Sequence, residues 1–217
     1  MSRKCLYMVI SVLFMFSGCA VVFQKGRRSD IERIKELESK INDLEATKKM
    51  LEARLQEEIS NKQVKVSMED KGLVITVMAK VLFDSGKAEL KPEFLSILDK
   101  VGKILKEQVP SKYIEIQGHT DNQPIKYSGW KSNWELSCAR ALSVVHYLID
   151  NCGINPQRIY ASCFGEYRPV ATNTTKEGKQ KNRRVEIIVL PEEFKKVQIE
   201  EMEGLEEEAV LEEENLK

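Results

Sequence analysis

Strand-like and helix-like patterns alternate along residues 64–190, and this alternation limits the fold more than any other feature of the chain. Two stretches, 92–105 and 133–150, repeat apolar residues every three or four positions, as helices do. Short runs rich in β-branched residues have the composition and period of strands: 64–68, 73–77, 113–117, 158–162 and 185–189. We also expect Val81-Leu82-Phe83 to be a short strand or a strand end. The order predicts an α/β domain, with a mixed sheet covered by two helices.

The first residues of the chain have the pattern of an export signal. Arg3 and Lys4 precede an apolar run over 6–16, which is shorter than the ~20 residues that a spanning helix needs. Phe16-Ser17-Gly18-Cys19 resembles the lipobox of bacterial lipoproteins, with Phe in place of the usual Leu. We therefore predict a signal peptide over 1–18, palmitate and related acyl chains on Cys19, and a linker over 19–28. A short membrane anchor kept in the mature protein is the alternative.

The residue after Cys19 bears on the location of the protein. Ala20 stands where proteobacterial lipoproteins retained in the inner membrane carry Asp. Several acyl chains anchor a protein stably, which a single chain does not. These features predict a lipid anchor in the outer membrane, with the rest of the chain in the periplasm.

A heptad pattern occupies residues 29–60, with no Pro or Gly between Ser29 and Glu69. Because the apolar stripe is narrow, we predict a parallel coiled coil of about four heptads that self-associates, with its oligomer number open, and provides ~45 Å of stand-off. A single amphipathic helix lying on the domain is the alternative. The apolar positions are Ile34, Leu37, Ile41, Leu44, Leu51 and Leu55, and Lys48 interrupts them.

Charge is balanced overall and uneven locally. The 34 basic residues equal the 34 acidic ones, so the chain lacks the basic excess of nucleic-acid-binding proteins. Glutamate dominates residues 191–217, which we predict to be a solvated, disordered tail or a frayed helix.

The cysteines are expected to have different fates. Cys5 lies in the predicted signal, and three cysteines follow Cys19. Cys138 and Cys152 are ~21 Å apart on one predicted helix, too far to bond. A Cys152–Cys163 disulfide is open, but buried free thiols are favoured. Neither a CxxC pair nor a histidine cluster indicates a metal, and no cofactor is implied.

Two polar stretches lie where α/β proteins commonly bind ligands, at a strand end and at a helix start. Residues 118–122 follow a predicted strand, and residues 133–141 open the second helix. Asp121 can accept from an ammonium group, and Arg140 offers a planar guanidinium to a carboxylate. Together they suit a zwitterionic ligand, such as an amino acid with a free backbone end. An ordinary surface pairing of the two residues is the alternative.

Four blocks resemble the OmpA-like (OmpA/MotB C-terminal) domain in order and spacing: 118–122, 133–141, 164–169 and 182–185. The resemblance extends from Val81 to Leu190. It implies a periplasmic βαβαββ module that binds peptidoglycan non-covalently through the diaminopimelate of the stem peptide. It gives Asp121 the ammonium and Arg140 the carboxylate. Asn133, Leu136, Thr120, Asn122, Phe83 and Asp84 would complete the ligand site, although Ser85-Gly86 departs from the aromatic-acidic pair that often follows in the family.

Catalysis is not predicted. His119 lies close to Asp121, but no activated nucleophile accompanies them, and we expect a structural histidine bonded to backbone at a strand end. Arg183 and Arg184 are expected to neutralise Glu166 or a helix end, and Asn182 to tie its loop to the cleft.

These features favour a non-enzymatic tether between outer membrane and cell wall, with a lipid anchor, a spacer and a wall-binding domain. A flagellar stator subunit of the MotB type is the alternative, because 121–125 and 132–136 resemble that branch. A stator requires a transmembrane helix with an ionisable residue, which the run before Cys19 lacks. A wall hydrolase is the third class considered, and it would need metal ligands or a nucleophile.

Overall fold

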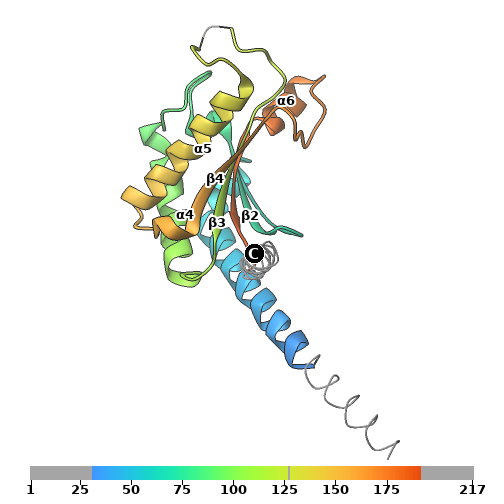
Figure 1. Cartoon of the computed structure of the whole chain (residues 1–217), viewed down its shortest axis with the longest axis vertical. Helices are drawn as coiled ribbons and strands as arrows, with labels where there is room; N and C mark the ends of the chain where they lie inside the picture. The colour runs from blue at the N-terminus through green and yellow to red at the C-terminus, as the bar shows by residue number, and fades with distance from the viewer. Residues whose placement is uncertain (1–30, 127, 192–217) are drawn as a thin grey trace, which may run out of the picture. The chain divides into compact units, whose positions relative to one another are not determined.

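A five-stranded mixed sheet forms the centre of the fold (Figure 1). The computed structural model describes residues 31–126 and 128–191, and the chain divides into two compact units at Asp43/Leu44. The strands follow the order β1-β2-β5-β3-β4, in which only β3 and β4 are parallel. Their bounds are β1 Val64–Glu69, β2 Gly72–Met78, β3 Ile114–His119, β4 Ile159–Gly165 and β5 Arg184–Val189.

The last strand, β5, lies in the middle of the sheet because it pairs on both sides. Ile187 lies opposite Ile75 of β2 and Ile116 of β3. All six residues of β5 are buried, as expected of a strand with a neighbour on each side. The expected α/β fold with a mixed sheet is confirmed.

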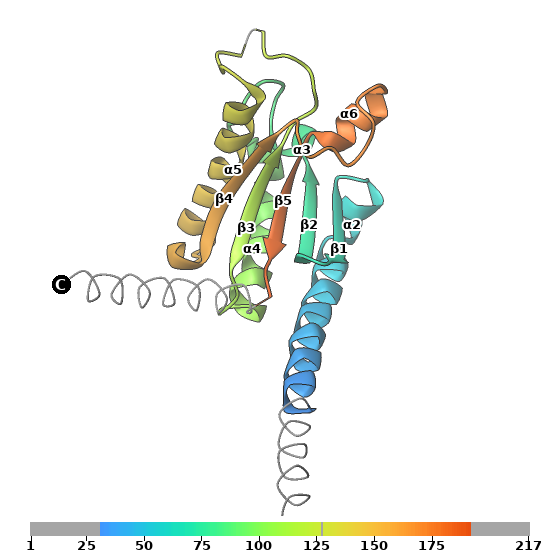
Figure 2. The same ribbon diagram turned by 45° about the vertical axis from the view of Figure 1, so that its right-hand side comes forward.

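Two long helices, α4 (Leu95–Gln108) and α5 (Asn133–Asp150), cover one face of the sheet (Figures 1 and 2). The apolar stripe of α4 is buried through Leu98, Val101 and Leu105. Helix α5 approaches β3 so closely that a Cβ on Gly118 would lie 2.0 Å from the carbonyl oxygen of Ser137. Glycine is therefore required at the position where the helix start meets the strand end.

Short helical segments connect these elements: α2 (Gln56–Ser60), α3 (Ala79–Leu82), η1 (Pro92–Phe94), η2 (Pro156–Arg158) and α6 (Lys176–Asn182). The strand expected at Val81-Leu82-Phe83 is wrong, because one helical turn follows β2 there. Phe83 makes only an isolated bridge to Leu90. All three side chains are buried, and such a short apolar run does not distinguish a strand from a helical turn.

Residues 31–54 are helical, but the heptad positions differ in their surroundings. In the first unit, Ile34 and Ile41 are more than half exposed. In the second unit, Leu44, Leu51 and Leu55 belong to the core of their own domain. The predicted coiled coil is therefore wrong for this C-terminal part of the helix, and the compact unit begins well before residue 64. Self-association through residues 31–43 stays a prediction.

A disulfide joins Cys138 of α5 to Cys163 of β4, with their Cα atoms 4.9 Å apart. The prediction of free thiols is therefore wrong for Cys138 and Cys163, and so is the alternative of a Cys152–Cys163 disulfide. The packing of α5 on the sheet brings together two cysteines that are 25 residues apart in the sequence. Cys152 forms no disulfide with the described residues and is half-buried. The predictions for 1–28 (the signal peptide, Cys19 and the linker) and for the acidic tail concern residues outside the described ranges, apart from Pro191.

Candidate functional site

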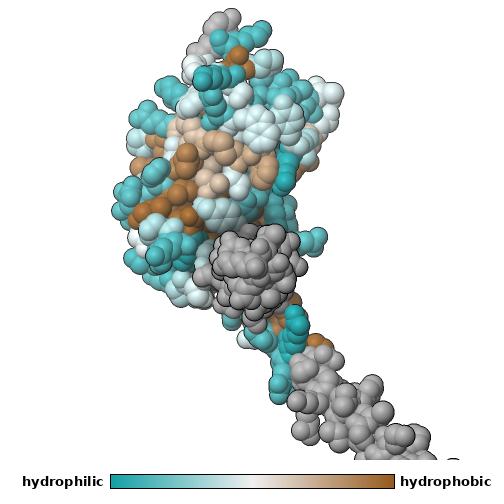
Figure 3. Space-filling model, viewed as in Figure 1, coloured by the Kyte–Doolittle hydropathy of each residue, from teal (hydrophilic) through white to brown (hydrophobic). Residues whose placement is uncertain are grey.

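A cleft of about 950 Å³ lies where β3 ends and α5 begins. Its walls come from the segment after α3 (83–87), the segment after β3 (120–126), the start of α5, and Arg183 before β5. These loops lie at the upper end of the molecule, where the surface is mostly hydrophilic, whereas apolar side chains gather over α5 and β4 (Figure 3). The cleft is thus suited to a small polar ligand. The expected residues that line it are Asp121, Arg140, Asn133, Leu136, Thr120, Phe83 and Asp84.

Asp121 is buried, and each of its two carboxylate oxygens has a partner. Its Oδ2 forms an ion pair with Nη1 of Arg183, and its Oδ1 accepts from the backbone N–H of Gln123 at 3.2 Å. The carboxylate is therefore held in one orientation at the cleft wall. Asp121 and Arg140 do not form a salt bridge with each other, because the ion-pair partner of Asp121 is Arg183.

Arg140 extends from α5 toward the segment after α3. Its Nε donates to the carbonyl of Lys87 at 2.9 Å, its Nη2 donates to that of Asp84 at 3.4 Å, and the guanidinium lies over the Phe83 ring. Burial and then the charge of Arg183 lower the pKa of Arg140 to about 10, while Asp121 opposes this shift. The side chain stays cationic at neutral pH, and three of its five N–H groups remain after these two bonds.

Asn133 ties the segment after β3 to the helix start. Its Nδ2 lies 3.0 Å from the Gln123 carbonyl and 2.7 Å from Oε2 of Glu166, with the Asp121 carbonyl also in range. Ser132 caps the helix by accepting from the Glu135 N–H. Leu136, one turn along, supplies a buried apolar wall. The helix start thereby fixes both a polar and an apolar side of the cleft.

Thr120 lines the cleft and has a hydroxyl group without a hydrogen-bond partner among the described residues. Its side chain is 3% exposed, and among residues 31–126 and 128–191 its Oγ1 has no partner. Its backbone N–H donates to Gly165 at 2.8 Å, so the residue is fixed in position. A buried hydroxyl without a partner is unfavourable by ~1–3 kcal/mol, and a polar ligand in the cleft would satisfy it.

Residues 82–183 match the OmpA family. The folded domain of this chain belongs to the OmpA family. Motility protein B of Bacillus subtilis is 40% identical over 149 residues, covering 69% of this chain and 57% of that protein. The probable lipoprotein YiaD of Escherichia coli is 36% identical over 140 residues, covering 64% and 61%. The chain thus spans little more than half the length of either relative.

A solved structure agrees with this assignment. The cell wall anchor of the T6SS from Pseudomonas aeruginosa is 34% identical, with a TM-score of 0.60 over 65% of this chain and 97% of that one. The OmpA family domain here therefore shares both sequence and backbone arrangement with a protein described as a cell wall anchor.

Three expectations about the OmpA family domain need correction. Asn122 is exposed and does not line the cleft, because the chain turns after Asp121. Arg183 does not neutralise Glu166 or a helix end; it pairs with Asp121 and lines the cleft. Asn182 does not reach the cleft either. Its buried side chain bonds Val170, Ala171 and Asn173 and shapes their loop.

His119 is structural in an unexpected way. The side chain is 2% exposed and stacks on Phe164 at 5.3 Å, but neither ring nitrogen has a hydrogen-bond partner among the described residues. The expected bond to backbone is therefore wrong. Burial, reinforced by the charge of Arg184, lowers the pKa of His119 to about 3. The imidazole is neutral at neutral pH and does not line the cleft with Asp121.

In the described ranges no group of His, Cys, Asp or Glu is placed to hold a metal ion. Among the helices of those same residues, none has the length and apolar character needed to cross a membrane.

Proposed function

We propose that this protein is an outer-membrane lipoprotein that binds peptidoglycan through the diaminopimelate of the stem peptide and tethers the membrane to the wall. The observation that carries the proposal is that Asp121, Arg140 and Thr120, whose hydroxyl is unpaired among the described residues, line one cleft. The side-chain end of diaminopimelate bears one ammonium and one carboxylate. Two buried groups of opposite charge are complementary to such a ligand.

Recognition would need no catalytic step. The ligand carboxylate would take N–H groups of Arg140 that its backbone contacts leave over, in a charge-assisted bond. The ligand ammonium would share the Asp121 carboxylate with Arg183. Because both protein charges are already buried and oriented, little side-chain ordering would accompany binding.

The anchor rests on the N-terminal sequence. Acylated Cys19 would hold the chain in the outer membrane, and residues up to Asp43 would separate it from the wall-binding domain. The similarity to YiaD, a probable lipoprotein, supports this arrangement.

A stator subunit is the second candidate, because Motility protein B of Bacillus subtilis is 40% identical to this chain. Labelling cells with radioactive palmitate separates the two. If the protein is a lipoprotein, the wild type should be labelled and Cys19→Ala should not. An unlabelled wild type that keeps Met1 would support the stator instead.

Wall binding itself is tested by sedimenting the protein with purified sacculi. We expect co-sedimentation with diaminopimelate-containing walls and weak binding to walls with lysine at that position, since lysine lacks the second carboxylate. Equal binding to both walls would contradict the proposed ligand.

A further inference from the structure

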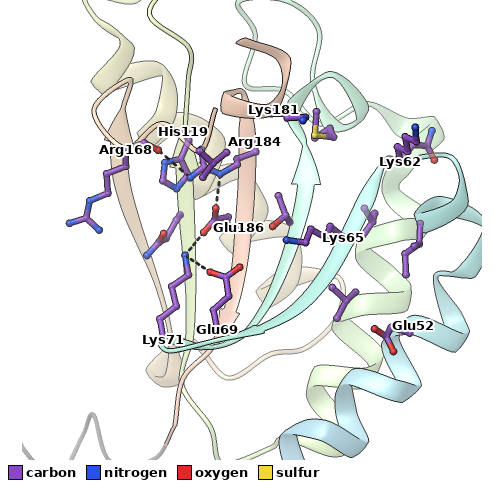
Figure 4. A pocket seen from close by; sticks show the side chains of 18 of the residues that line it. Glu52, Lys62, Lys65, Glu69, Lys71, His119, Arg168, Lys181, Arg184 and Glu186 are labelled. Carbon is purple, nitrogen blue, oxygen red and sulfur yellow. Dashed lines mark hydrogen bonds and ion pairs between the residues drawn. The ribbon is translucent and has the colours of Figure 1, made fainter. Parts of the chain in front are cut away.

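A second groove, of about 970 Å³, lies on the sheet face that α4 and α5 leave open (Figure 4). It shares no lining residue with the cleft. Its floor is a row of polar side chains on four adjacent strands. Lys65 lies opposite Thr76, Thr76 opposite Glu186, and Glu186 opposite Gln117. Segment 168–170, α6 and the residues around α2 supply the rest of its lining.

The groove carries an excess of positive charge. Six cationic and three acidic side chains line it, a difference of +3. Lys71 and Arg184 are paired with Glu186, both at 2.5 Å. Lys62, Lys65 and Lys181 are exposed and form no ion pair with the described residues. These free lysines surround an amphipathic floor, so an occupant should be acidic and partly apolar.

His119 gives independent evidence that the groove could bind a further polar group. It lines the groove, is 2% exposed, and has no hydrogen-bond partner in the described part of the chain. Figure 4 shows its ring beside the Arg184–Glu186–Lys71 cluster. A neutral imidazole can donate one hydrogen bond, and a carboxylate brought beside it would accept that bond.

The chain contains a segment with the required chemistry. Residues 200–214 hold nine glutamates and no lysine or arginine, together with Met202, Leu205, Val210 and Leu211. The described chain stops at Pro191, whose ring lies 3.3 Å from where a Cβ on Gly72 would stand. Gly72 follows Lys71 of the groove. The nine residues after Pro191, up to Glu200, can span up to ~30 Å, so the acidic segment can reach the groove.

We propose that the acidic segment 200–214 docks in this groove of its own chain, with its glutamates beside Lys62, Lys65 and Lys181 and its apolar residues on the floor. The tether keeps the segment at a high effective concentration, so weak contacts suffice and the intramolecular complex prevails over acidic partners in solution. Docking would replace the expected disordered tail and would shield the open sheet face and the edge strand β1. This proposal does not depend on the ligand of the cleft.

Hydrogen–deuterium exchange tests the docking directly. The full chain in detergent is compared with a variant that ends at Pro191. Segments 62–69 and 181–184 should exchange several-fold more slowly in the full chain, and α4 should exchange equally in both. The protection should disappear at about 1 M NaCl, where the Debye length is about 3 Å.

Charge reversal supplies the matched control. Lys62→Glu with Lys65→Glu should remove the protection, whereas Lys103→Glu with Lys106→Glu, two exposed lysines on α4, should leave it unchanged. Circular dichroism confirms that both variants are folded. Equal exchange with and without the tail overturns the proposal. So does protection at 84–87 and 120–126 instead, or protection that grows with protein concentration and thus reports a second copy.

Discussion

Arg183 and Asp121 form an ion pair that links the start of β5 to the segment after β3. The pairing of the two strands makes this contact, since His119 lies opposite Arg184 in antiparallel register. Asp121 is buried, and Arg183 is its ion-pair partner. A ligand ammonium would therefore replace Arg183 as the partner of this carboxylate, or share the carboxylate with it.

Replacing Arg183 should affect the fold as well as binding. In Arg183→Ala, Asp121 keeps only the Gln123 N–H, so we expect a loss of ~1–3 kcal/mol in the free energy of unfolding. Urea titration followed by circular dichroism measures it. Arg183→Lys retains the charge and should recover most of the loss. An unchanged midpoint in Arg183→Ala would show that the pair does not stabilise the domain.

The Cys138–Cys163 disulfide should contribute substantially to stability. It closes a loop of 25 residues, so we expect the Cys138→Ser, Cys163→Ser variant to lose ~3 kcal/mol through greater freedom of the unfolded chain. Thermal unfolding of the wild type with and without dithiothreitol provides a second measurement. Cys152→Ser, which removes only the free thiol and keeps the disulfide, is the control and should lose stability in dithiothreitol as the wild type does. A reductant effect as large in the double variant as in the wild type would refute the assignment.

Local patterns were sufficient to predict most of the elements. The stripes of α4 and α5 reflect burial on one face, which repeats at a fixed period along the chain. The central strand β5 is buried throughout, and its run of β-branched residues marked it. Val81–Phe83 failed because three consecutive buried residues carry no period. The heptad at Leu44–Leu55 failed for a different reason: an apolar stripe has the same spacing whether it faces a second helix or the domain of its own chain.

The lining of the cleft was predictable where a family motif marks the residue. Asp121, Arg140, Asn133 and Leu136 belong to such blocks, and all four line the cleft. The role of Arg183 was not, because its contact with Asp121 depends on β5 lying beside β3. The Cys138–Cys163 pair likewise depends on how α5 packs on β4. Contacts between distant elements are set by tertiary packing, and residue spacing in one sequence does not report it.

The burial of His119 should make stability depend on pH. Its pKa is about 3 in the folded chain, against 6.5 ordinarily. Above pH 6.5 the imidazole is neutral in both states and has no effect. As the pH falls from 6.5 toward 3, only the unfolded chain takes up the proton, so stability should fall by up to about 1.4 kcal/mol per pH unit.

His119→Phe isolates this effect, because it keeps an aromatic ring beside Phe164 and removes both unpaired nitrogens. Urea unfolding at several pH values gives the difference between the two proteins. The variant should be at least as stable near neutral pH and should gain relative to the wild type as the pH drops. A difference that stays constant with pH would mean that His119 is not kept neutral by the fold.

Self-association should depend on the exposed isoleucines before Leu44. Ile34→Ser with Ile41→Ser is expected to shift the unlipidated protein toward monomer in analytical ultracentrifugation, with little change in the unfolding of the domain. Leu51→Ala should do the opposite, leaving association intact and costing the domain ~2–5 kcal/mol through a core cavity. A wild type that is monomeric at all concentrations would contradict the predicted coiled coil.

Calorimetric titration with a soluble stem peptide tests the diaminopimelate site most directly. Each charge-assisted contact is worth ~1.5–3 kcal/mol, so Asp121→Ala and Arg140→Ala should each weaken binding of a diaminopimelate tripeptide about ten- to a hundred-fold. The double variant should lose less than the sum of the single losses, because either change leaves a ligand charge unpaired. The lysine tripeptide should bind the wild type about as weakly as the diaminopimelate tripeptide binds Arg140→Ala. Folded single variants that bind the diaminopimelate tripeptide as tightly as the wild type would contradict the assignment of this cleft.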